Sequence, residues 1–309
     1  IVSAIAAARR EGTEHHRLPV ALQIAAVFVG AVYFPYARYM PKGPELVRAI
    51  VSVDRSTGAI RWISKGLPGP RGPMHSDNSA ATPTPVTDGE RIFAYFGSAG
   101  LLCADAGGKV VWTAKELPFE ARHGVASSPI LCGDRVIVLS ESDVGGYLAA
   151  LDRRTGELAW KTDRGKKIHR YAGNCRTPAI KEISGRKTMV VWGHTDISGY
   201  DPLIGEELWS HEVGDFGKMN KPEASPFSDD KCLYLAGPRK TMALAMDKLA
   251  TDDSPVVWEQ KTSDGAQCPS PVLKDGLLFA ISDVGTAYCL DAKTGETLWR
   301  ERLRKQHYA

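Results

Sequence analysis

The sequence predicts an all-β protein, a β-propeller of four-stranded antiparallel blades, and three observations lead to this fold class. Six of the seven tryptophans close copies of one phrase that begins at an aspartate, usually turns at a glycine and ends at the tryptophan. The gaps between these tryptophans are 50, 48, 49, 49 and 41 residues. Each repeat reads as four short strands joined by tight turns. This period and strand count are typical of propeller blades.

The copy that ends at Trp160 shows how one blade is built. It starts at Ser128-Pro129, and its apolar runs 136–139 and 147–151 are separated by a glycine pair, as in a hairpin. A Thr155-Gly156 turn then leads into the last strand. The same order recurs from the pairs Thr84-Pro85, Thr177-Pro178, Ser225-Pro226 and Ser270-Pro271. A solenoid of β units is the alternative architecture.

The repeated tryptophans are predicted to have a structural role. A large ring that ends one strand can pack against the neighbouring blade, which explains its recurrence without a ligand. Trp192 is different, because it lies in a second strand, and we expect its ring to pack locally or face solvent. The six docking residues are Trp62, Trp112, Trp160, Trp209, Trp258 and Trp299.

The repeats divide the chain into two parts. Residues 47–309 are predicted to form the β-propeller domain, and residues 1–46 an N-terminal segment outside the pattern. Six tryptophan phrases indicate about six visible blades. We expect seven or eight blades in the complete protein, with this sequence truncated at the C-terminal side.

The N-terminal segment contains a candidate membrane anchor at residues 20–37. These eighteen residues carry no charge, and basic residues flank them on both sides. About 20 apolar residues span a bilayer, so this stretch is just long enough for a tether that leaves the propeller exported. The alternative is that the segment forms blade strands, because residues 18–20 and 27–30 resemble residues 84–86 and 93–97.

The overall composition excludes some classes of function. A net charge of +3 with interspersed signs is ordinary for a soluble surface, and no basic run suggests nucleic acid. The six cysteines are scattered without a C-x-x-C pair, so we expect small buried side chains in place of a disulfide framework.

The repeated phrase also carries a family resemblance. Residues 150–160 and 289–299 resemble the tryptophan-docking motif of the pyrroloquinoline-quinone-like propellers, and the resemblance covers residues 47–299. It implies the propeller fold. It says little about chemistry, because that family includes both quinoprotein dehydrogenases and non-catalytic scaffolds. The chain resembles the outer-membrane assembly lipoprotein type more than the dehydrogenases.

A polar mouth is the candidate ligand site. The loops from the last strand of one blade to the first strand of the next open on one face of a propeller, where side chains distant in sequence meet. The candidate ligand-binding residues are His75, Asp77, Asn78, Arg122, His123, Asn174, Arg176, Asn220, Lys221, Glu223 and Gln267. Mixed charge with arginines favours a polar or anionic small molecule, or a protein loop. The alternative is that these residues pair with each other and with water.

The leading hypothesis is a non-catalytic binding or scaffold protein, located in the periplasm or otherwise outside the cytoplasm, possessing no catalytic residue, metal or cofactor. Its expected partner is a protein or a polar small molecule, and residues 20–37 would tether it to the inner membrane. The alternative is a quinone (PQQ)-dependent oxidoreductase with calcium at the mouth. The resemblance would then imply an adjacent cysteine pair, which is absent. It would also imply oxygen ligands, for which the candidates are Asp77, Asn78, Asn174 and Glu223.

Overall fold

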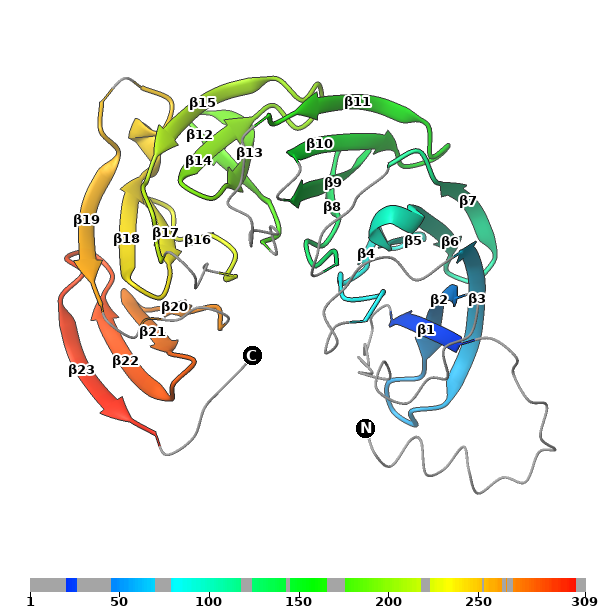
Figure 1. Ribbon diagram of the computed structural model, residues 1–309, viewed down its shortest axis with the longest axis horizontal. Coiled ribbons are helices and arrows are strands. Elements are labelled where there is room, and N and C mark those ends of the chain that lie inside the picture. Colours follow the sequence, from blue (N-terminus) through cyan, green and yellow to red (C-terminus); the bar gives the residue numbers. More distant parts are fainter. Residues whose placement is uncertain are drawn as a thin grey trace. The chain divides into compact units, whose positions relative to one another are not determined.

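The structure, a computed structural model, confirms the all-β prediction (Figure 1). The chain divides into two compact units, residues 1–167 and 168–309. Among the described residues the only helical elements are two three-residue 3-10 turns, Gly97–Ala99 and Met246–Lys248. The structure describes residues 21–26, 46–69, 79–117, 124–142, 145–165, 176–217, 223–251, 253–262, 265 and 269–303.

Sheet 1, the first of the N-terminal unit, departs from the predicted blade. It has three strands, β1 (Ala21–Ala26), β2 (Leu46–Val53) and β3 (Ile60–Gly69). The pair β2–β3 is antiparallel as expected, whereas β1 lies parallel to β2. A parallel neighbour needs a long connection instead of a hairpin, so no turn motif in the sequence announces it. Among the described residues, the parallel pairing of β1 is the feature of this sheet that the predicted antiparallel blade does not have.

The candidate membrane anchor at residues 20–37 overlaps β1. The structure describes only Ala21–Ala26 of that stretch and places them in a strand paired with β2. The other residues of the stretch lie outside the described residues. Within the described part of the chain, no helix has the length and apolar character needed to cross a membrane.

Sheets 2 and 3 complete the described part of the N-terminal unit, and both are four-stranded, antiparallel and in chain order. Sheet 2 contains β4 (Val86–Thr87), β5 (Arg91–Tyr95), β6 (Leu101–Asp105) and β7 (Val110–Ala114). Sheet 3 contains β8 (Ile130–Cys132), β9 (Arg135–Ser142), β10 (Gly145–Asp152) and β11 (Leu158–Asp163).

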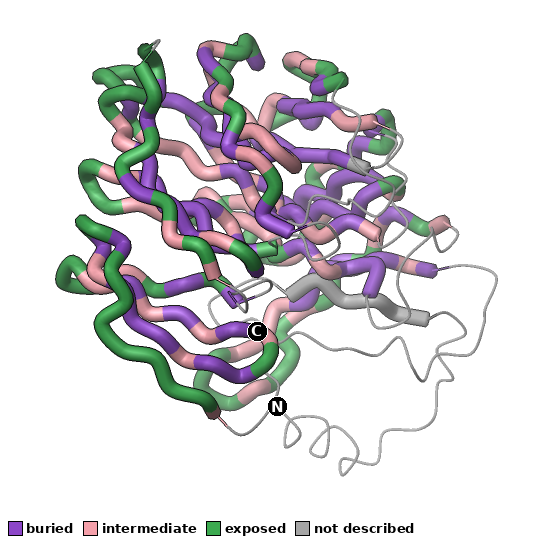
Figure 2. Tube along the Cα trace, turned by 60° about the vertical axis from the view of Figure 1, so that its left-hand side comes forward, coloured by how far each residue is buried: buried purple, intermediate pink, exposed green. Residues whose placement is uncertain are grey.

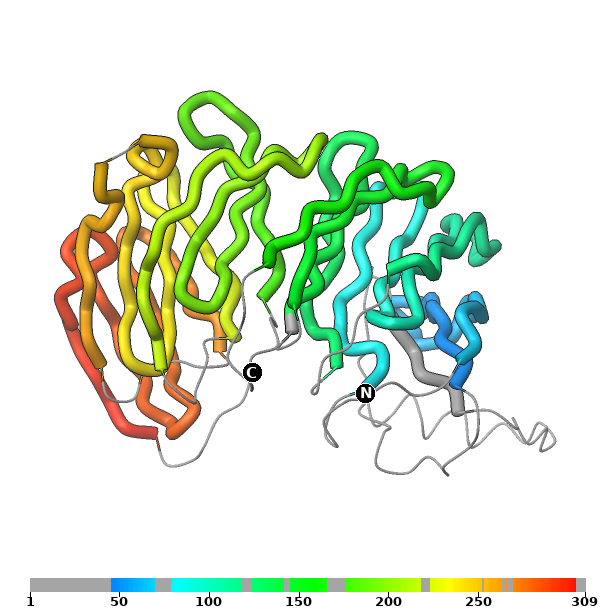
Figure 3. The backbone as a smooth tube through the Cα atoms, turned by 45° about the horizontal axis from the view of Figure 1, so that its top comes forward, coloured from blue at the N-terminus to red at the C-terminus, as the bar shows by residue number. Residues whose placement is uncertain are grey.

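The C-terminal unit holds three more sheets with the same antiparallel order, and Figure 3 shows the strands of the last two side by side in yellow to red. Sheet 4 contains β12 (Ala179–Ile183), β13 (Arg186–Trp192), β14 (Asp196–Tyr200) and β15 (Glu207–Glu212). Sheet 5 contains β16 (Phe227–Ser228), β17 (Cys232–Ala236), β18 (Lys240–Ala245) and β19 (Val256–Lys261). Sheet 6 contains β20 (Val272–Lys274), β21 (Leu277–Ile281), β22 (Thr286–Asp291) and β23 (Thr297–Arg302).

In most repeats the aspartate of the phrase builds the turn before the strand that carries the tryptophan. The Asp152 carboxylate accepts N–H bonds from Arg154 at 2.8 Å and Thr155 at 3.0 Å. Gly156 then has a φ of 78°, which glycine adopts at little cost. Asp54 and Asp291 make equivalent turns. The recurring Asp and Gly are thus explained by backbone geometry.

Within each unit the core lies between consecutive sheets and is formed mainly by their middle strands (Figure 2). In the N-terminal unit, Phe93 and Leu101 of sheet 2 pack with Val136 and Val138 of sheet 3. The outermost strands are more exposed, and all six residues of β23 are exposed. This gradient follows from the repeat, because the middle strands have a sheet on both faces.

Three of the repeated tryptophans bind the turn of the next sheet. A Cβ added at Gly108, Gly156 or Gly295 would come within 2.6 Å of the ring of the preceding tryptophan. Only glycine therefore lets the ring lie on that turn. The three hydrogen bonds run from Trp62 Nε1 to the Ala106 carbonyl at 3.1 Å, from Trp112 Nε1 to Arg153 at 3.2 Å and from Trp258 Nε1 to Ala292 at 3.0 Å.

Trp209 is placed differently, because the next repeat has changed its turn. The 3-10 turn Met246–Lys248 replaces the usual Asp-to-Gly turn there. The Trp209 ring lies against Gly199 of its own sheet, and its buried Nε1 has no hydrogen-bond partner among the described residues. The neighbouring His211 shares a hydrogen bond of 2.8 Å with the Leu249 carbonyl.

The three other tryptophans differ in their exposure. Trp160 is partly buried, and Trp299 exposes 46% of its surface. Trp192 lies in the second strand of sheet 4, is 1% exposed and meets Phe216 edge-on at 4.8 Å between ring centroids. The prediction that Trp192 packs locally is confirmed.

The Ser/Thr-Pro pairs join neighbouring sheets near their first strands. The amide of Thr84 donates to the Ser128 hydroxyl at 2.9 Å, and the amide of Thr177 donates to the Ser225 hydroxyl at 3.0 Å. In both cases the donor precedes the proline of one repeat and the acceptor precedes the proline of the next. These bonds fix the starts of consecutive inner strands relative to each other.

Candidate functional site

The structure describes two of the eleven residues predicted to line the polar mouth. Arg176 precedes β12, and Glu223 precedes β16. The other nine lie outside the described residues: His75, Asp77, Asn78, Arg122, His123, Asn174, Asn220, Lys221 and Gln267.

Arg176 is bound to its own sheet. The residue is 4% exposed, and its Nη1 donates to the Trp192 carbonyl at 2.8 Å and also to the Gly193 carbonyl. The guanidinium lies over the Trp192 ring, 4.4 Å from its centroid, in a cation–π contact. Arg176 therefore holds the end of β13.

A second cation extends this contact to sheet 5. The Lys240 ammonium donates to the Val213 carbonyl at 2.6 Å and to Glu259 at 3.0 Å, and it lies 4.7 Å from the centroid of the Phe216 ring. Phe216 in turn contacts Trp192. Two stacked cations thus flank the pair of contacting rings, in the order Arg176, Trp192, Phe216 and Lys240, and this row fixes the connection from sheet 4 to sheet 5.

Glu223 is exposed and was predicted as a candidate calcium ligand. It belongs to no group of three or more His, Cys, Asp or Glu side chains, among the described residues, that could hold a metal. Calcium takes six to eight oxygen ligands, so Glu223 with its described neighbours does not fit this ion.

The described cysteines are buried or partly buried thiols. Cys103, Cys132, Cys232 and Cys289 form no disulfide. Burial raises the pKa of Cys103 to about 12, and it also raises the pKa of Cys232 and Cys289. Because the thiolate is the nucleophile, these side chains are poor candidates for covalent chemistry.

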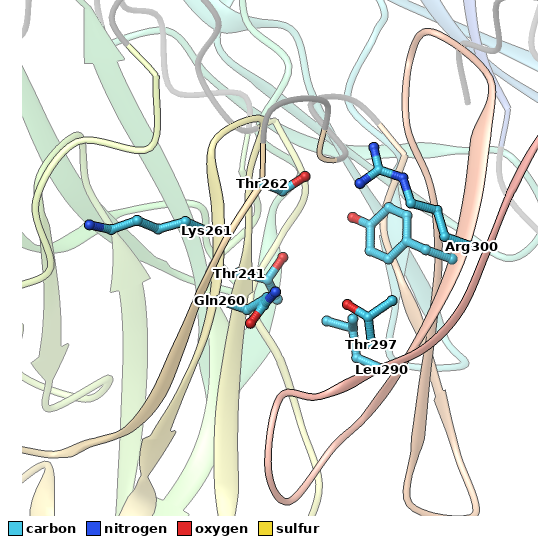
Figure 4. A pocket seen from close by; sticks show the side chains of 8 residues that line it. Thr241, Gln260, Lys261, Thr262, Leu290, Thr297 and Arg300 are labelled. Atoms are coloured by element: carbon cyan, nitrogen blue, oxygen red, sulfur yellow. The ribbon is translucent and has the colours of Figure 1, made fainter.

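A small polar cleft lies between sheets 5 and 6 (Figure 4). Its volume is about 40 Å³, and the two sheets supply its opposite walls. Figure 4 shows Thr241, Gln260 and Thr262 facing the residues of sheet 6, whereas Lys261 points away from the cleft. The lining residues are Thr241, Gln260, Lys261, Thr262, Tyr288, Leu290, Thr297 and Arg300.

Two pairs of cross-strand neighbours place these side chains. Thr241 of β18 pairs with Gln260 of β19, and Tyr288 of β22 pairs with Arg300 of β23. Paired residues share a face of their sheet, so each wall presents a pair to the other. The repeat pattern placed the predicted site in the loops between sheets, so this cleft between strands was not predicted. The signal was a polar residue at strand positions that other repeats fill with apolar ones.

Comparison with known proteins places the chain among propeller repeats. The model of the family described as outer membrane protein assembly factor BamB matches residues 48–301. The solved structure of BamB from Moraxella catarrhalis has a TM-score of 0.57 at 19% identity, and the match covers 79% of this chain and 65% of that one. A quinohemoprotein alcohol dehydrogenase from Pseudomonas putida HK5 has a TM-score of 0.52 at 18% identity, with 71% and 41% covered. At these identities the likeness shows the fold.

Two curated relatives are similar over about half of the chain. The serine/threonine-protein kinase AfsK of Streptomyces griseus is 27% identical over 170 residues, which are 52% of this chain and 20% of the kinase. The 1-butanol dehydrogenase (quinone) of Thauera butanivorans is 26% identical over 155 residues, 45% of this chain and 24% of the enzyme. The chain thus spans less than two thirds of each of these proteins.

Proposed function

We propose, because this chain belongs to the family of the outer membrane protein assembly factor BamB, that it is a non-catalytic β-propeller scaffold that binds protein partners. The family description supports a role in assembly at the outer membrane, and hence a periplasmic or other extracytoplasmic location. A tether through residues 20–37 is the competing role for a stretch of which Ala21–Ala26 pair with β2 in the structure.

Exposed apolar residues on the outermost strands carry the proposal. Val256 and Val257 of β19 are 45% and 48% exposed, and Leu298 and Trp299 of β23 are 49% and 46% exposed. Single exposed apolar residues are normal, whereas neighbouring pairs on the outer strands of consecutive sheets suit a protein interface. Aromatic residues such as Trp299 are also enriched at the centres of such interfaces.

Binding to the outer-membrane assembly machinery of the same organism tests this proposal. We expect the double variant Val257→Glu with Leu298→Glu to bind the purified machinery at least tenfold more weakly, because charged carboxylates would be buried in the interface. Leu203→Glu is the matched control, since Leu203 is 50% exposed on a turn of sheet 4. Equal binding by the double variant and the wild type would contradict the proposed surface.

The quinone-dependent oxidoreductase is the second candidate, favoured by the similarity to the quinone dehydrogenase. Its test adds pyrroloquinoline quinone and calcium to the full chain. Under the scaffold proposal we expect no calcium-dependent shift in quinone absorbance and no oxidation of alcohols or sugars. Retained quinone together with alcohol oxidation would overturn the scaffold proposal.

A further inference from the structure

Two residues of the cleft between sheets 5 and 6, Thr241 and Tyr288, stand at strand positions that are apolar at the other described junctions between sheets within the two units. In sheet 2, Leu101 pairs with Ala114, two residues beyond Trp112. In sheet 5, Thr241 pairs with Gln260, two residues beyond Trp258. Thr241 and Gln260 are therefore the counterparts of Leu101 and Ala114.

The facing wall can be matched in the same way. Ala149 of sheet 3 pairs with Lys161, just after Trp160, and Tyr288 of sheet 6 pairs with Arg300, just after Trp299. Tyr288 is thus the counterpart of Ala149, and Arg300 is the counterpart of Lys161. Between sheets 2 and 3, Leu101, Ala114 and Ala149 are all buried in one apolar cluster.

At the other described junctions within the units, the counterparts of Thr241 and Tyr288 are apolar, whereas the counterparts of Gln260 are the polar residues His211 and Ser64. Between sheets 4 and 5 the counterparts of Thr241 and Tyr288 are Ile197 and Met242, which are 0% and 1% exposed. Between sheets 1 and 2 they are Ile50 and Leu102, both fully buried. Polar side chains at these positions form fewer apolar contacts between the sheets than Leu or Ile would. Departures of this kind from a repeated pattern tend to mark functional positions.

The lining has the chemistry of an anion site. Hydroxyls of Thr241, Thr262 and Thr297 line the cleft, together with the Gln260 amide, the Tyr288 phenol and the Arg300 guanidinium. Among the described residues no carboxylate lines the cleft, and the nearby Glu259 is paired with Lys240. Arginine forks match a carboxylate in geometry and charge.

The size of the cleft and its access to solvent limit which anions could bind there. A volume of about 40 Å³ is small, so the cleft suits a small polar group such as a carboxylate. Thr297 and Arg300 are exposed, which leaves the cleft open to solvent on the side of β23. A side chain from outside can therefore enter it.

We propose that this cleft binds a carboxylate group, supplied by an acidic side chain of a protein partner. This inference rests on the proposed scaffold function, because it identifies the chemistry of the partner at a second contact. The cleft lies between the two strands that carry the exposed apolar pairs, β19 and β23. An acidic residue next to an apolar segment would engage both features.

The test measures fluorescence anisotropy of a labelled hexaglutamate peptide on the full chain at low ionic strength. We expect Arg300→Gln to weaken binding about tenfold, because a charge-assisted bond is lost. Lys161→Gln is the matched control, since it removes the same charge at the same position of another repeat. Equal weakening by both variants would show surface electrostatics only and overturn the proposal.

A second variant fills the cleft without changing its charge. Thr241→Leu introduces the residue that sheet 2 has at position 101, and we expect it to weaken peptide binding while the melting temperature stays the same or rises. Unchanged peptide binding by Thr241→Leu would place the peptide elsewhere and contradict the proposal. The melting temperature shows that a loss of binding is not a loss of folding.

Competition with acetate distinguishes a carboxylate of a protein side chain from a free small carboxylate as the ligand of the cleft. Displacement of the peptide by millimolar acetate, dependent on Arg300, supports one shared carboxylate site. Acetate binding with no peptide binding would overturn the protein source. If the peptide fails to bind while the outer-strand variants still impair binding to the machinery, only this inference fails. Quinone-dependent oxidation would instead refute the scaffold proposal and leave the peptide result standing.

Discussion

At the scale of single residues, glycine and tryptophan determine how consecutive sheets meet. Trp112 lies over Gly156, and a Cβ there would come within 2.6 Å of its ring. The sequence predicted that these tryptophans pack between blades, because a ring at a fixed period is best explained by a repeated contact. It could not show that Trp209 would differ, since that depends on the changed turn Met246–Lys248 in the next repeat.

Gly156→Ala is expected to destabilise the protein by about 2–4 kcal/mol, from a left-handed backbone and a steric clash together. Gly185→Ala is the control, because Gly185 has a φ of 74° and a Cβ there would meet nothing within 4 Å. Its cost should be only about 1 kcal/mol. Urea denaturation measures both, and equal costs would contradict a packing role for the glycine under Trp112.

At the scale of elements, most sheets could be predicted from the sequence, and sheet 1 only in part, because the parallel pairing of β1 was not foreseen. In the five four-stranded sheets, turn motifs that can be recognised in the sequence separate the strands. Gly133-Asp134 and Thr155-Gly156 are the examples in sheet 3. Strand β1 has no hairpin to join it to β2. The uncharged residues of β1 fit a membrane span as well as a buried strand, because both are apolar. Only the pairing of β1 with β2 distinguishes the two structures.

Deletion of residues 1–45 tests the role of β1. The strand covers one edge of β2 from Leu46 to Val51, so its loss should expose unpaired backbone groups. We expect the shortened protein to melt several degrees lower or to aggregate, as followed by circular dichroism and light scattering. A soluble product with an unchanged melting temperature would instead favour the anchor at residues 20–37.

At the scale of the whole molecule, the turn carboxylates link stability to pH. N–H bonds from Arg154 and Thr155 lower the pKa of Asp152, and N–H bonds from Thr294 and Lys293 lower the pKa of Asp291. A pKa that is lower in the folded state stabilises it above the unfolded value, near 3.9. This contribution is lost as the pH falls through the folded pKa.

We therefore expect the urea midpoint to fall between about pH 5 and pH 3, and to fall less in Asp152→Asn than in the wild type. Asparagine keeps an acceptor oxygen for the turn and cannot take up the proton. Glu157→Gln, an exposed change in the same turn, should leave the slope nearly as it is. The same slope in all three proteins would exclude a contribution from Asp152.

The candidate site could be predicted only in outline. The mouth was inferred from the ends of the repeats, and of its described members Arg176 is bound to Trp192 and Gly193 while Glu223 is exposed. Burial of an arginine by its own sheet depends on tertiary packing that no local motif specifies. The cleft at Thr241 was visible as a break in the repeat, and a position-by-position comparison with Leu101 finds it.

The hydrogen bonds at the Ser/Thr-Pro pairs bear on how such a chain can grow. Thr84 and Ser128 occupy the same position in successive repeats, and each position offers both an amide and a hydroxyl. The amide at this position thus donates to the next repeat, and the hydroxyl at the same position can accept from the previous repeat. Duplication of a whole repeat copies both halves at once, so gene duplication can lengthen the array without any new junction having to evolve.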